Sequence, residues 1–92
     1  MAEEFESLIE ASLRRGEPVA LATVLSGPTA GRRLLVWVAG HTFGDLGWPR
    51  LNQRVALYAE QLLERGARPA AAKKFELPGA GNVEVRLELR LP

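Results

Sequence analysis

The C-terminal stretch alternates apolar and charged side chains, and this pattern constrains the fold more than any other feature of the chain. Charged residues stand at every second position, namely Glu84, Arg86, Glu88 and Arg90, with valine or leucine between them. Successive side chains of a β-strand point to opposite faces of its sheet. The alternation therefore predicts a strand over residues 83–91 with one face buried and the other in water.

Three further strands are predicted upstream, and their compositions differ. Residues 18–25 (PVALATVL) are apolar without interruption, which is typical of a central strand buried on both faces. Residues 33–39 (RLLVWVA) predict a second strand, whose Trp37 we expect in the core. Residues 41–46 (HTFGDL) predict a short third strand, and Gly44 inside it indicates a bulge or a close approach of backbone.

Two helices are predicted from apolar residues at three- and four-residue spacing, over residues 3–15 and 49–65. Each ends in arginine followed by glycine, Gly16 and Gly66, with a proline soon after. These matching ends suggest one helical layer packed on one sheet. With a further strand predicted over residues 70–77, the order is αβββαββ. We expect one α+β domain, residues 1–92, with a mainly antiparallel or mixed sheet.

Composition excludes several classes of protein. The 92 residues contain no cysteine, so a disulfide framework, a thiolate metal site and a cysteine nucleophile are all ruled out. A net charge of +1 is too small an excess of positive charge to indicate binding to nucleic acid or to an anionic membrane. No apolar run reaches the ~20 residues of a membrane helix. The acidic N-terminus is unlike a signal peptide, which predicts a cytoplasmic protein. With His41 as the single histidine, a zinc site would need carboxylates for nearly all its ligands, so no metal site is expected. Ten arginines against two lysines, with few amides, are compatible with a thermophilic or GC-rich source.

A catalytic role finds little support in the residues. His41 and Asp45 would lie roughly 13 Å apart along one face of a strand, too far for direct contact unless the chain bends. A turn histidine is the favoured interpretation. No serine occupies a nucleophile elbow, and no acid–base pair has a suitable setting. We therefore predict that the protein is not an enzyme.

The only arrangement that resembles a ligand loop is Gly44-x-x-Gly47, between a strand and the helix that begins at Pro49. Backbone amides at a helix N-terminus can bind an anion, and Arg32, Arg33 or Arg50 could add charge-assisted hydrogen bonds. The local pattern favours the plainer alternative, a tight strand-to-helix turn with solvated arginines.

Two other features have both a structural and a functional interpretation. Trp48, just before the second helix, is expected to pack against that helix, with a ligand platform as the alternative. The row of charges over residues 84–90 is expected to be a solvated sheet face, with a docking surface as the alternative.

Read together, four segments resemble the N-terminal domain of the XdhC/CoxI family, proteins that assist the maturation of molybdenum hydroxylases. They are residues 16–24 (GEPVALATV), 31–36 (GRRLLV), 44–47 (GDLG) and 81–88 (GNVEVRLE). Family members commonly carry glycines and a cysteine where this chain has Trp48, Pro49 and Arg50. Longer members continue into a Rossmann-type domain, which is not expected here. Neither cysteine chemistry nor nucleotide binding is therefore carried over.

The resemblance implies a non-catalytic accessory protein that binds molybdenum cofactor (molybdopterin), or docks onto a molybdenum hydroxylase subunit or a cofactor-maturation enzyme. The cofactor-binding residues expected are Arg33, Gly44, Gly47 and Arg50. Arg33 and the two glycines match the family pattern, and Arg50 is chosen for its charge and position. The alternative is a scaffold or homo-oligomerisation module that keeps the fold without the ligand.

Overall fold

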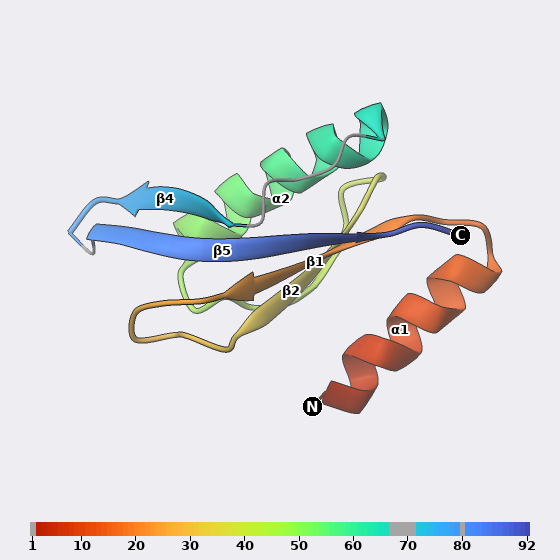
Figure 1. Ribbon diagram of the computed structural model, residues 1–92, viewed down its shortest axis with the longest axis horizontal. Helices are drawn as coiled ribbons and strands as arrows, with labels where there is room; N and C mark the ends of the chain where they lie inside the picture. Colours follow the sequence, from red (N-terminus) through yellow and green to blue (C-terminus); the bar gives the residue numbers. More distant parts are fainter. Residues whose placement is uncertain (1, 67–71, 80) are drawn as a thin grey trace.

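The computed structural model describes residues 2–66, 72–79 and 81–92 and has the predicted order αβββαββ (Figure 1). The seven elements are α1 (Ala2–Arg14), β1 (Val19–Val24), β2 (Arg33–Trp37), β3 (Thr42–Gly44), α2 (Pro49–Arg65), β4 (Lys73–Leu77) and β5 (Gly81–Arg90). The α+β fold class is thus confirmed. Within the described residues, neither helix is both long and apolar enough to cross a lipid bilayer.

The five strands form one sheet in the order β3-β2-β1-β5-β4, and every neighbouring pair is antiparallel. The apolar strand β1 lies at the centre, as its composition predicts, and pairs with β2 on one side and β5 on the other. All its residues except Thr23 are buried. The chain returns through α2 to place β5 beside β1, so strands that lie far apart in sequence become neighbours.

The two helices cover opposite faces of this sheet (Figure 1), so the prediction of one helical layer is wrong. Val19 and Leu21 of β1 pack with Ile9 of α1, whereas Ala20 and Ala22 pack in the core beneath α2. A strand that is apolar on both faces needs a cover on each. The similar helix ends explain how each helix stops but contain no information about the face on which it lies.

Several predicted boundaries also differ from the structure. The second strand ends at Trp37 instead of residue 39, because the chain turns there and the Gly40 amide donates to the Trp37 carbonyl at 2.9 Å. The third strand is only three residues long and pairs with residues 34–36. The last strand spans residues 81–90 rather than 83–91, and Leu91 beyond it is 58% exposed. Of the predicted strand over residues 70–77, positions 70 and 71 lie outside the described residues.

The predicted ends of α2 are confirmed. The helix begins at Pro49, and Gly66 after its last residue adopts a left-handed φ of 64°. In that conformation the Gly66 amide donates to the carbonyls of the last helical turn, which would otherwise lack partners. Gly16 has a φ of 77° just after α1, in agreement with its predicted role as a cap.

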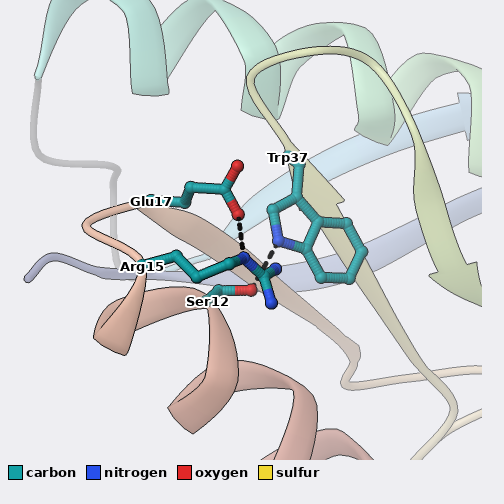
Figure 2. Close-up of polar contacts among 4 residues, drawn as sticks. All are labelled: Ser12, Arg15, Glu17 and Trp37. Atoms are coloured by element: carbon teal, nitrogen blue, oxygen red, sulfur yellow. Dashed lines mark hydrogen bonds and ion pairs between the residues drawn. The ribbon is translucent and has the colours of Figure 1, made fainter.

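A buried hydrogen bond joins α1 to the sheet (Figure 2). Ser12 lies on the sheet-facing side of α1 and is fully buried, and its Oγ accepts a hydrogen bond of 2.7 Å from Nε1 of Trp37 on β2. The Trp37 indole is therefore both part of the apolar core and held in orientation. The exposed pair of Arg15 and Glu17, joined at 2.9 Å, lies where the chain leaves α1 for β1.

We predict that Ser12→Ala lowers the free energy of unfolding by about 1–3 kcal/mol, because the buried Trp37 Nε1 then has no acceptor. Urea denaturation of the two proteins measures the difference. Ser7→Ala, an exposed change on the same helix, is the control and should be close to neutral. The loss of unfolding free energy in the Ser12→Ala/Trp37→Phe double variant should be smaller than the sum of the losses in the two single variants. Losses that add in full would contradict a direct interaction.

Candidate functional site

The loop between β3 and α2 is held by the side chains of Asp45 and Asn52. Asp45 Oδ1 accepts hydrogen bonds from the Gly47 amide at 2.8 Å and from Asn52 Nδ2 at 2.9 Å. Asn52 Oδ1 in turn accepts from the Leu46 amide at 2.8 Å. These amides are satisfied within the loop, so an anion nearby would be bound by side chains rather than by the loop backbone.

The same network changes the titration of Asp45. The hydrogen bond from Asn52, then that from the Gly47 amide, and then the charge of Arg32 hold the pKa of the Asp45 carboxyl below its ordinary value. All three favour the ionised carboxylate. Asp45 therefore stays negatively charged beside an arginine.

The two glycines of this loop each have a packing reason. A Cβ on Gly44 would lie 2.5 Å from the Arg33 carbonyl oxygen and 3.0 Å from the Phe5 ring. A Cβ on Gly47 would lie 2.3 Å from Cγ2 of Thr29. Both residues also have φ near +100°, a backbone conformation that is strongly unfavourable for residues other than glycine. The spacing of the glycines thus fixes a tight turn, as the plainer interpretation predicts.

A groove of about 800 Å³ lies between the N-terminal half of α1 and the β2–β3 edge of the sheet. Arg33 lies in it with its guanidinium carbon 4.5 Å from the centre of the Phe5 ring. Phe5 in turn meets Phe43 edge to face at 5.3 Å between ring centres. The lining residues are Glu4, Phe5, Gly31, Arg32, Arg33, Phe43, Gly44 and Asp45. This volume is in the range of small-molecule sites.

The structure does not gather all four predicted cofactor residues in one place. Arg33 and Gly44 line the groove, and Gly47 lies against Thr29 at the next turn of the loop. Arg50 lines a separate apolar pocket of about 200 Å³, together with Trp48, Pro49, Leu77 and Pro78. The groove and this Arg50 pocket share no lining residue.

Both tryptophans and the histidine are explained by packing. Trp48 packs against the core on the α2 side, as predicted, although its buried Nε1 has no hydrogen-bond partner among the described residues. Trp37 is in the core. The ring of His41 stacks on the Trp37 ring at 4.6 Å between ring centres. Asp45 instead accepts hydrogen bonds from Asn52 and from the Gly47 amide. His41 is a turn residue, as expected, and does not form a pair with Asp45.

Three interactions of this region are not predicted from the sequence, namely those of Phe5, Asp45 and Asn52. The helical spacing that includes Phe5 gives no sign of its contact with Arg33, which joins residues from α1 and β2. The Asp45-x-Gly47 spacing is a signal for an Asx turn that was available in the sequence. No local signal points to Asn52, because its partner amide is six residues away on another element.

The comparison with protein families identifies a relationship. The family model described as "XdhC and CoxI family" matches residues 12–73, about two thirds of the chain. This chain belongs to the XdhC and CoxI family. The family is linked to the maturation of molybdenum hydroxylases, and its members are accessory maturation proteins. Among proteins with curated descriptions, none matches the chain.

The XdhC and CoxI match starts in the last turn of α1 and ends at the first residue of β4. It contains three of the four segments on which the resemblance rests, and the groove residues from Gly31 to Asp45 lie inside it. The fourth segment, in β5, lies beyond the match, as do Glu4 and Phe5. In the described part of the chain, no group of three or more histidine or carboxylate side chains is placed to bind a metal ion.

We predict that Gly44→Ala destabilises the fold by at least about 2 kcal/mol, because the new Cβ meets the Arg33 carbonyl in a backbone conformation that already disfavours it. Chemical denaturation measures the loss. Gly27→Ala is the matched control, since Gly27 has a similar φ of 87° but nothing within 4 Å of its Cβ position. Equal costs at the two positions would show that the close approach at Gly44 contributes nothing.

A pH dependence follows from the Asp45 network. Because folding lowers the pKa of this carboxyl, its contribution to stability is present above the ordinary pKa of about 4 and is lost as the pH falls through the folded value. The difference in unfolding free energy between the wild type and Asp45→Asn should therefore shrink between pH 7 and pH 3. Asn52→Ala, which removes the strongest hydrogen-bond effect, should reduce that pH-dependent difference. A difference that stays constant with pH would contradict this account.

Proposed function

We propose that this protein is an accessory factor in the maturation of a molybdenum hydroxylase and that its groove binds the molybdenum cofactor. Membership of the XdhC and CoxI family supports the general role. The observation that carries the binding proposal is the groove itself, which is lined by two arginines and two phenylalanines and in which the Arg33 guanidinium lies over the Phe5 ring.

The groove residues fit part of this cofactor. Molybdopterin carries a phosphate and a flat pterin ring, together with two sulfur atoms that bind the metal. Arginine guanidinium groups suit the phosphate, and flat aromatic and guanidinium surfaces suit the ring. The 92 residues contain no cysteine, so the chain offers no thiolate to the metal. Binding would therefore rest on charge and stacking at the organic part of the cofactor.

The two arginines of the groove differ in setting. Arg33 is half-buried and held against Phe5, whereas Arg32 is exposed. A held guanidinium loses less conformational freedom when it binds a ligand, so Arg33 should contribute more to affinity. Arg50, in its own pocket, would contribute to the same ligand only if that ligand also reached across the β3–α2 loop.

We predict that Arg33→Ala weakens retention of the cofactor at least tenfold, since a charge-assisted hydrogen bond is worth about 1.5–3 kcal/mol. Equilibrium dialysis against molybdopterin released from a molybdenum enzyme measures the effect. Arg86→Ala on β5 is the control, because Arg86 is exposed and does not line the groove. Arg50→Ala should have a smaller effect than Arg33→Ala.

Two outcomes would overturn the proposal in different ways. If Arg50→Ala were the more damaging change, the cofactor site would be the Arg50 pocket rather than the groove. If the wild type retained no cofactor, with or without a molybdenum hydroxylase present, cofactor binding would be excluded. A chain that then bound its partner equally well with both arginines changed would be a scaffold.

A further inference from the structure

The side of α2 that faces away from the sheet has an exposed leucine at its centre. Among the described residues, α2 is the outer layer on its face of the sheet (Figure 1), and Leu57 on its outward side is 60% exposed. Leu57 stands midway between Pro49, where the helix begins, and Arg65, where it ends. Its neighbours on this side are all polar and exposed, namely Arg50, Gln53, Arg54, Gln61 and Glu64.

The charges on this outward side are arranged unfavourably for a single helix. Arg50 lies in the first turn and Glu64 in the last, the reverse of what the helix dipole favours, and only Arg65 in the last turn has the favourable sign. Arg54 follows Arg50, and Glu64 follows Glu60, at a spacing of four residues, so like charges repel one turn apart. In the described part of the chain, neither Arg50 nor Glu64 forms an ion pair. One copy of the chain therefore gains nothing from this arrangement.

The same arrangement is complementary to a second copy of itself. Arg50 and Glu64 stand seven positions before and after Leu57, and Gln53 and Gln61 stand four positions before and after it. When two α2 helices pack antiparallel with their leucines in contact, Arg50 of each copy lies opposite Glu64 of the other. These ion pairs are roughly 10 Å from Leu57, from the rise per residue of an α-helix. Parallel packing would instead place arginine beside arginine and glutamate beside glutamate.

The two remaining charges of α2 point away from the centre of this outward side. On the flank towards β4, the Arg54 guanidinium donates a hydrogen bond to the Glu76 carbonyl and lies 5.8 Å from the centre of the Phe75 ring. On the opposite flank, Glu60 Oε1 lies 3.6 Å from the position that a Cβ on Gly40 would occupy. Each side chain is thus held beside its own sheet, which leaves the outward surface to the central leucine and the terminal charges.

We propose that the outward side of α2 is a homodimer interface, in which the helices of two copies pack antiparallel about a twofold axis at Leu57. An Arg50–Glu64 pair lies on each side of the contact between the leucines. A contact between single helices is smaller than the ~800 Å² per partner of a standard interface, so the dimer should be weak, with a dissociation constant on the order of 10 μM or above. This inference goes beyond the proposed function, because the groove lies beside α1, which covers the other face of the sheet.

Sedimentation equilibrium with the full chain, up to millimolar concentration, measures the association. The wild type should be a reversible mixture of monomer and dimer. Leu57→Glu should weaken dimerisation at least about tenfold, because it removes the apolar contact and places two like charges at the twofold axis. Leu91→Glu is the matched control, since Leu91 is 58% exposed but lies beyond β5, and it should leave the association unchanged. A wild type that is monomeric at every concentration, or a dimer that Leu57→Glu does not weaken, would overturn the proposal.

Charge reversal tests the antiparallel arrangement. Arg50→Glu and Glu64→Arg each place like charges opposite one another, so each variant alone should dimerise about tenfold more weakly than the wild type. A mixture of the two variants restores both ion pairs and should form a heterodimer with roughly the affinity of the wild type. Both changes agree with the helix dipole, so the melting temperature of each diluted variant should be no lower than that of the wild type. A mixture that associates no better than its components would contradict the arrangement.

A partner other than a second copy gives a different result. If the outward side of α2 bound another protein, the purified chain would stay monomeric, and mixing the two charge variants would not produce a heterodimer. Either result assigns the surface to a different occupant and overturns the homodimer.

Discussion

The burial of β1 on both faces is the constraint on which the rest of the structure depends. Its residues from Val19 to Leu21 are at most 4% exposed, and it pairs with a neighbour along each edge. In this position the backbone N–H and C=O groups of the strand are hydrogen-bonded along both edges. Its apolar side chains are shielded from water on both faces. Only one arrangement of two helices meets that demand, with one helix on each side of the sheet.

The two faces of β1 are not equivalent. Towards α2 the strand presents Ala20 and Ala22, and these small side chains leave room for Leu51 and Val55 of the helix in a closely packed core. Towards α1 it presents Val19 and Leu21, which contact a smaller cluster that also contains Trp37. The hydrogen bond between Ser12 and Trp37 fixes the orientation of the Trp37 ring in this smaller cluster. The larger cluster thus contains most of the buried apolar residues, and the smaller one holds α1 against the sheet beside the groove.

The local patterns predict the elements well because each depends on neighbouring residues. The alternation in β5 is confirmed, with Val83, Val85 and Leu87 buried and the charged row on the opposite face. Arg86 and Glu88 in that row lie 3.5 Å apart within the strand, and their side chains are 51% and 37% exposed, which fits a face in contact with water. The side of the sheet that each helix covers was not predictable in the same way, because it depends on the register of strands distant in sequence.

The candidate site shows the same division between local and distant information. The sequence locates a turn at Gly44 and Gly47, but the reasons for both glycines are contacts with Arg33, Phe5 and Thr29, which come from other elements. Arg50 is grouped with Arg33 only for its charge and position, and the fold assigns the two residues to separate pockets.

The division into two pockets bears on how a family member without cysteine could work. Trp48, Pro49 and Arg50 form an apolar pocket with Leu77 and Pro78. With no cysteine in the sequence, this pocket offers no thiolate, whereas the groove beside α1 is lined by charged and aromatic side chains. Any cofactor bound by this chain would therefore be held through its organic part, by interactions that ionic strength weakens. In the proposed function such binding would be readily reversed, as the transfer of a cofactor to another protein requires.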